Sequence, residues 1–245
     1  MSHGFKGVVK RELAYYFSTP LAYVILFIFL FSAAILTFKE RFFQICQADL
    51  RLFFDSLPVL FIFIVPAIGM RLISEERKSG TIELLLSFPV TVRAVVLGKY
   101  IAAWLFLAVG LILSFPVVIT VNYLGNPDNI VILVGYAGAF LLAGCYLSIS
   151  IFSSAITKNQ VISFILSVSI CAIFAFADYP SVLNILRLFL PMGLIEAFEN
   201  MSFINHYESM RRGVIELRDF VYYIFFISGW ITAAGIVLNE RMGSR

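Results

Sequence analysis

Residues 130–156 read IVILVGYAGAFLLAGCYLSISIFSSAI, and no Asp, Glu, Lys or Arg interrupts them. An α-helix needs about 20 apolar residues to cross the hydrocarbon core of a bilayer. A barrel strand would be about half as long and would alternate polar with apolar residues. The stretch therefore predicts a transmembrane helix, which satisfies its own backbone hydrogen bonds in lipid.

Five more stretches of mainly apolar residues flank this one. Apolar residues form 61% of the 245 positions and charged residues 13%, against roughly half and a quarter in soluble proteins. A soluble fold would need a polar surface that these stretches do not supply. The sequence therefore predicts an all-α integral membrane protein with six transmembrane helices. We expect a single transmembrane domain over 1–245, with spans at 21–38, 57–73, 100–121, 130–156, 161–177 and 220–238.

Basic residues are distributed unevenly over the loops, which indicates how the chain sits in the membrane. Lys and Arg near span ends favour the cytoplasmic side. With the amino terminus inside, 11 of the 18 basic residues fall on the cytoplasmic side and 7 outside, whereas the 15 acidic residues split 5 to 10. We therefore expect a multi-pass protein of the cytoplasmic (inner) membrane with both termini in the cytoplasm.

Residues 3–19 carry apolar side chains at helical spacing ahead of the first span. The apolar positions are Phe5, Val8, Val9, Leu13, Tyr16 and Phe17, and the basic ones on other sides are Lys6, Lys10 and Arg11. Such a helix can bury its apolar face among lipid headgroups while its basic groups meet anionic lipid. We expect an interfacial helix whose membrane-interface residues are Phe5, Lys6, Lys10, Arg11 and Tyr16. A plain orientation signal is the alternative.

The connector between the second and third spans, residues 71–99, is far longer than a simple helical hairpin needs. Four consecutive charges at 75–78 precede a break at Ser79-Gly80. Thr81 can cap a new short helix that contains three consecutive leucines at 84–86. Apolar side chains exposed in a charged setting are typical of a docking surface. We expect this segment to bind another protein.

Residues 74–86, SEERKSGTIELLL, are similar to the coupling segment of type-2 ABC exporter permeases (the ABC-2 family). They resemble in particular the small six-span branch that contains the gliding-motility and nitrous-oxide-reductase-maturation permeases. KREL at 10–13 and YFSTP at 16–20 resemble the amino-terminal helix of that branch. Residues 213–214 with 218–219 resemble its closing segment, so the resemblance spans nearly the whole chain.

The resemblance implies the permease subunit of an ATP-binding-cassette exporter. Its coupling segment, residues 74–90 here, would insert into a groove on a separate ABC ATPase subunit, which would bind ATP and Mg. Closure of two such subunits would move the helices of two permeases, either two copies of this chain or this chain and a paralogue. Membrane lipid and an external accessory protein are further candidate partners. The implied ATPase-interface residues are Glu75, Glu76, Arg77, Lys78, Gly80, Thr81, Glu83, Leu84, Leu85 and Leu86.

The sequence has no phosphate-binding P-loop, because its one Gly-Lys pair, Gly98-Lys99, is followed by Tyr100 and lacks the upstream glycine spacing. We therefore expect no catalytic residue and no cofactor in this chain, and energy from a partner. An ATP-driven permease that moves an external partner without cargo stays open. An ion-coupled secondary transporter is less favoured, because the spans carry no ionisable residue at membrane depth. The substrate, the direction of transport and the choice between two identical and two related permeases are not indicated.

Residues 178–219 form a long external stretch whose apolar part, 183–195, is too short to span the bilayer. This part resembles the paired re-entrant helices that cap the outer side of type-2 exporters. His206 and the glutamates near it fit no metal-ligand spacing, so we expect a solvated polar rim and no metal site. A net charge of +3 without basic runs interleaved with aromatics argues against a nucleic-acid partner.

Overall fold

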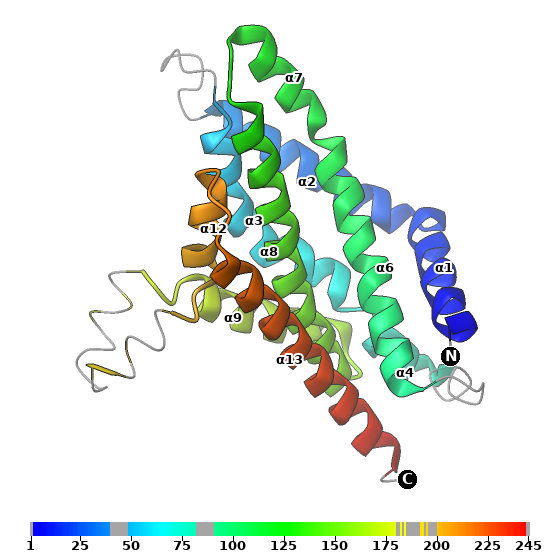
Figure 1. Ribbon diagram of the computed structural model, residues 1–245. Coiled ribbons are helices and arrows are strands. Elements are labelled where there is room, and N and C mark those ends of the chain that lie inside the picture. Colours follow the sequence, from blue (N-terminus) through cyan, green and yellow to red (C-terminus); the bar gives the residue numbers. More distant parts are fainter. Residues whose placement is uncertain are drawn as a thin grey trace.

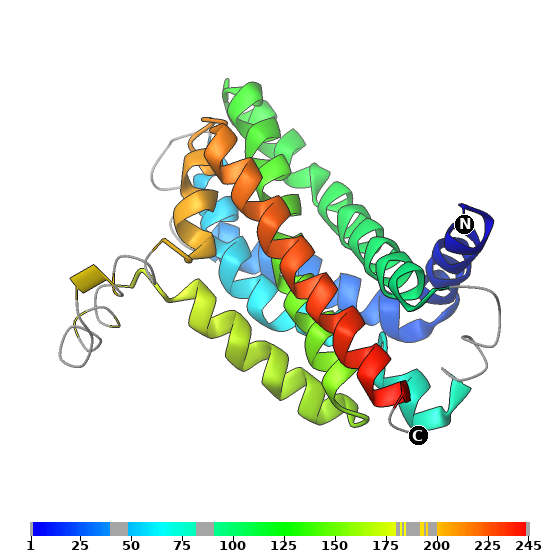
Figure 2. The same cartoon turned by 60° about the horizontal axis from the view of Figure 1, so that its bottom comes forward.

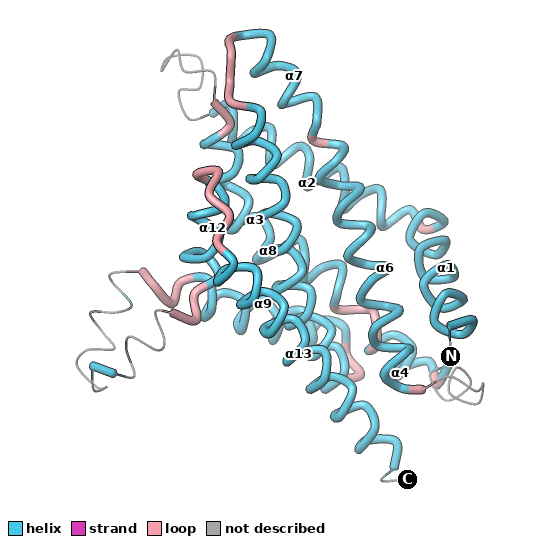
Figure 3. The backbone as a smooth tube through the Cα atoms, viewed as in Figure 1, coloured by secondary structure: helices cyan, strands magenta, loops and turns pink. Residues whose placement is uncertain are grey.

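Helix α8 (Asn129–Ile156) runs through the middle of the molecule, and most of the other helices pack directly against it (Figure 1). The computed structural model describes residues 2–39, 49–81, 91–179, 182, 184, 192–193, 195 and 200–243. Within these ranges the protein is all-helical and contains no strand, which confirms the predicted fold class (Figure 3). The other helices are α1 (Ser2–Ser18), α2 (Pro20–Lys39), α3 (Arg51–Gly69), α4 (Ser74–Ser79), α6 (Val92–Leu113), α7 (Phe115–Leu124), α9 (Gln160–Ala175), α12 (Phe203–Arg211) and α13 (Leu217–Gly243).

Glycines let neighbouring helices approach α8 closely. A Cβ atom added at Gly135 would lie 2.7 Å from the ring of Phe54 on α3, and one at Gly138 would lie 2.8 Å from the Cβ of Met210 on α12. Helices gain little hydrophobic energy by associating in lipid, so such close backbone approach is how they gain packing contacts. The small residues of α8 therefore explain its central position.

Five described helical segments are long and apolar enough to cross a membrane. They are Pro20–Phe38, Arg51–Ser79, Val92–Leu124, Asn129–Ile156 and Leu217–Arg241. Helix α9, where the sequence predicts a span over 161–177, has 16 residues. At 1.5 Å per residue it is about 24 Å long, somewhat shorter than the roughly 30 Å hydrocarbon core. The protein is therefore a multi-pass membrane protein with five span-length helices in its described part.

The third predicted span, 100–121, extends in both directions as α6 and α7. The two helices meet at Ser114, two residues before Pro116, which has no backbone N–H to continue the helical ladder. The Ser114 hydroxyl lies 2.6 Å from the carbonyl of Leu111 and 2.9 Å from the hydroxyl of Tyr136 on α8. These hydrogen bonds satisfy polar groups at the junction inside the bundle.

Both chain termini lie at one end of the molecule, which we call the terminal end (Figures 1 and 2). The short helix α4 and the beginning of α6 lie at the same end. The predicted coupling-helix residues Glu83, Leu84, Leu85 and Leu86 lie outside the described residues, as does most of the expected external re-entrant hairpin at 183–195. The longest described part of the predicted external stretch is 200–219, which contains α12 and the turn before α13.

Candidate coupling site

A buried ion triad joins three helices at the terminal end. Lys99 of α6 is 2% exposed. Its Nζ lies 2.8 Å from Oε1 of Glu12 on α1 and 2.9 Å from Oε1 of Glu76 on α4. Moving an ammonium group out of water is costly unless it is paired, so the two carboxylates stabilise Lys99 in its buried position. The triad therefore fastens α1 and α4 to the same point of α6.

Helix α1 reaches the triad with one narrow face. Val8, Glu12 and Tyr16 follow each other at intervals of four residues and are all buried, as expected for one stripe of a helix. Val8 packs against Gly98, where an added Cβ would lie 2.8 Å from a methyl group of the valine. The ring of Tyr16 stacks on that of Phe106, with 4.8 Å between the ring centres. Glu12 thus lies between two apolar anchors and faces Lys99.

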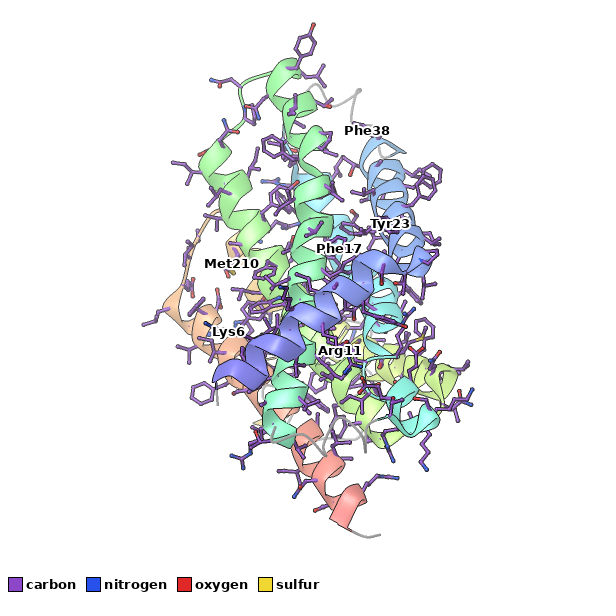
Figure 4. All side chains as sticks on the ribbon, turned by 90° about the vertical axis from the view of Figure 1, so that its right-hand side faces the viewer. Lys6, Arg11, Phe17, Tyr23, Phe38 and Met210 are labelled. Atoms are coloured by element: carbon purple, nitrogen blue, oxygen red, sulfur yellow. The ribbon has the colours of Figure 1, made fainter. Side chains whose placement is uncertain are left out.

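This arrangement differs from the one that the sequence predicts for α1. The buried stripe faces α6 and includes a carboxylate, whereas Phe17 is 40% exposed. Figure 4 shows α1, which contains Lys6 and Arg11, lying across α6. The side chains of Lys6, Lys10 and Arg11 are exposed. Phe5 is half-buried, and Tyr16, expected at the membrane interface, is inside the packing. Burial raises the pKa of Tyr16 well above its usual value, so the hydroxyl stays protonated.

A second set of contacts joins α4 to the end of α8. The hydroxyl of Ser154 accepts hydrogen bonds from the backbone N–H groups of Ile73, at 3.0 Å, and Ser74, at 2.9 Å. The same hydroxyl donates to the carbonyl of Met70 at 3.0 Å. The first N–H groups of a helix have no partner within it, and here α8 supplies one. Arg77 of α4 also donates to the carbonyl of Ala155.

The remaining predicted interface residues of this segment differ in how far their side chains are exposed to solvent. Glu75 lies 3.6 Å from Arg71, whose guanidinium also lies 5.7 Å from the ring centre of Tyr15. Lys78, Gly80 and Thr81 are exposed. Gly80 ends α4 with a φ of +74°, a conformation that favours glycine.

A cleft of about 480 Å³ lies between α1 and α4, and the three residues of the triad form part of its wall. Its lining combines the triad with basic, acidic and hydroxyl side chains: Arg11, Glu12, Ala14, Tyr15, Tyr16, Ser18, Arg71, Leu72, Glu75, Glu76, Ser79, Thr81 and Lys99. Among the described residues, Oε2 of Glu76 is buried and has no hydrogen-bond partner. Glu76 thus lines the cleft, and the described residues leave one of its carboxylate oxygens without a hydrogen-bond partner.

Buried polar contacts join α4 directly to α6 and α8, and the ammonium group of Lys99 links it to α1. The searched, described residues contain no group of three or more His, Cys, Asp or Glu side chains that could hold a metal ion.

At the other end of the bundle, His206 is in a different setting from the solvated rim that the sequence predicts. It is 4% exposed, and its Nδ1 lies 2.6 Å from Asp219 at the start of α13. The ring stacks on Tyr222 with 3.9 Å between ring centres, and Ser209 donates to the other oxygen of Asp219. The serine thus bonds the carboxylate rather than the imidazole, so the trio is not arranged as a nucleophilic triad. It fastens α12 to α13 instead.

Sequence reasoning missed the triad and Ser154. Glu12 lies four residues from both Val8 and Tyr16, and this spacing already places it on the face that α1 buries. Lys99 directly precedes an apolar span, where a basic residue usually indicates only orientation. No sequence signal links Ser154 to α4, because the two are 80 residues apart.

These features define a multi-span membrane protein with a short helix braced against its bundle at one end. A family model described as ABC-2 family transporter protein matches residues 21–238, and the chain therefore belongs to the ABC-2 transporter family. A comparison with curated proteins gives no match. Members of this family are non-catalytic permeases that act with an ABC ATPase subunit.

Proposed function

We propose that this chain is the permease half of an ATP-driven exporter of the cytoplasmic membrane, and that a separate ATPase subunit docks on residues 74–90. The observation that carries the proposal is the bracing of α4. Buried polar contacts connect it directly to α6 and α8, and through Lys99 to α1, while its far end and the two residues after it, Lys78 to Thr81, are exposed. A segment anchored on one side and free on the other is suited to receive force from a partner. As in the sequence-based expectation, ATP and Mg bind to that partner.

The positions of the termini support six crossings with both termini on the same side of the membrane, and the excess of basic residues there favours the cytoplasmic side. An odd number of crossings would place the two ends of the chain on opposite sides of the membrane, but they lie at the same end of the bundle (Figure 1). The five span-length helices therefore need a sixth crossing. Helix α9 is the remaining apolar helix of suitable position, and local thinning of the bilayer at small cost accommodates its length. A complete complex would contain two permeases and two ATPase subunits, as the family resemblance implies.

The test is co-purification of the chain with an ABC ATPase, followed by ATP hydrolysis in reconstituted vesicles. Deleting Leu84 to Leu86 should abolish stimulation of the ATPase while the permease remains in the membrane. A matched control replaces Val214 and Ile215, which are 51% and 64% exposed in the turn before α13, by serine. This control should stimulate normally. Equal stimulation by the deletion variant would contradict the proposal.

A permease that moves an external partner without cargo is a second candidate. The observation in its favour is the apolar middle of α8 and α9, which contain no Asp, Glu, Lys or Arg and thus offer no charged group to a solute. Reconstituted complexes that bind an external protein but move none of a panel of lipids, peptides and sugars would favour this candidate. Vectorial transport of any of them would favour the exporter.

A further inference from the structure

The ion triad contains more negative than positive charge. Two carboxylates, Glu12 and Glu76, share one ammonium group, that of Lys99, and all three side chains are largely buried. Oε1 of Glu76 forms the ion pair with Lys99, whereas Oε2 has no hydrogen-bond partner among the described residues. A buried carboxylate oxygen without a partner is costly, so a further donor would stabilise this site.

The cationic groups nearby are already engaged or point outward. Arg71 pairs with Glu75 and lies over Tyr15, and Arg77 bonds to Ala155 on the side of α8. Arg11 lines the cleft, but its side chain is exposed. The cleft of about 480 Å³ is large enough to admit a side chain from outside, and it opens beside the segment on which we propose that the ATPase docks.

We infer that the cleft between α1 and α4 receives a basic side chain, arginine or lysine, from the ATPase subunit, and that this cation pairs with Glu76. This inference rests on the proposed function and specifies its partner contact. A buried charge pair across an interface fixes register and slows dissociation. The added cation makes the cluster neutral, so the docked ATPase becomes the second counter-ion of a network that already holds α1, α4 and α6.

Affinity measurements with Glu76→Gln test the inference. The variant keeps the shape of the side chain and leaves the Lys99–Glu12 pair in place. Binding of the co-purified ATPase to nanodisc-embedded permease should weaken about thirtyfold, within the range measured for truncated buried charge pairs. It should also become less sensitive to salt, because one ion pair is lost. Glu240→Gln, which neutralises an exposed carboxylate at the same end of the bundle, should bind as the wild type does.

The outcomes separate the inference from the proposed function. If the wild-type chain binds no ATPase, the proposed function fails. If it binds and Glu76→Gln binds equally well, only the inference fails. If Arg11→Gln reproduces the loss and the double variant adds nothing, Arg11 is the second counter-ion and the inference is overturned. If Glu76→Gln does not insert into the membrane, Glu76→Asp is measured instead. Its carboxylate is one methylene further from the partner, so the affinity for the ATPase should fall at least fivefold. Unchanged affinity would refute the inference.

Discussion

Replacing Lys99 by methionine tests whether the buried ion triad stabilises the helix bundle. Lys99 is 2% exposed, and its ammonium is the shared partner of Glu12 and Glu76 at 2.8 and 2.9 Å. Methionine fills a similar volume but leaves two carboxylates facing each other without a cation. Removing one partner of a buried ionic cluster typically costs about 3–5 kcal/mol. We expect Lys99→Met to destabilise the bundle by this amount, measured by equilibrium unfolding in mixed micelles.

A triple variant provides the control. Adding Glu12→Gln and Glu76→Gln to Lys99→Met removes all three charges, and replacing a whole buried ionic cluster by neutral groups is often close to neutral in stability. The triple variant should therefore recover most of the lost stability. If Lys99→Met alone stays within about 1 kcal/mol of the wild type, the three groups do not form a buried network and the reasoning fails.

Two further substitutions test the packing around α8, again by unfolding in mixed micelles. Ser154→Ala removes the acceptor of two backbone N–H groups at the start of α4 and should cost about 1–3 kcal/mol, whereas Ser153→Ala, whose hydroxyl bonds within its own helix, should cost clearly less. Similar losses for both would show that Ser154 makes no special contribution. Gly138→Ala places a Cβ at 2.8 Å from that of Met210 and should cost about 1–3 kcal/mol, whereas Gly229→Ala, with no atom within 4 Å, should be neutral or stabilising. An unaffected Gly138→Ala variant would show that α12 is not held as closely as described.

Much of the fold follows from the sequence, because lipid imposes a simple rule. An uninterrupted apolar run such as 130–156 has to be helical, and the structure forms helix α8 there. The length of α9 could not be read from apolarity alone, since its end depends on where the chain turns at Phe176. The break at Gly80 was predictable because glycine readily adopts the positive φ that ends α4.

The site is less predictable than the fold. The charge run at 75–78 indicates an exposed docking surface, but Glu76 turns inward to Lys99 and Arg77 turns to α8. Whether a charged side chain faces water or a buried partner depends on contacts between residues far apart in the chain. His206 illustrates the same point: its partner Asp219 lies on the next helix, and neither residue alone indicates burial.

The most direct test of docking on residues 74–90 is the accessibility of one cysteine in this segment. Cys145 and Cys171 are buried, so Leu85→Cys with Cys46→Ser gives a chain with a single candidate for labelling. A membrane-impermeant maleimide should label Leu85→Cys in inside-out vesicles without the ATPase, and the bound ATPase should protect it. Labelling from outside intact cells, or equal labelling with and without the ATPase, would contradict the account.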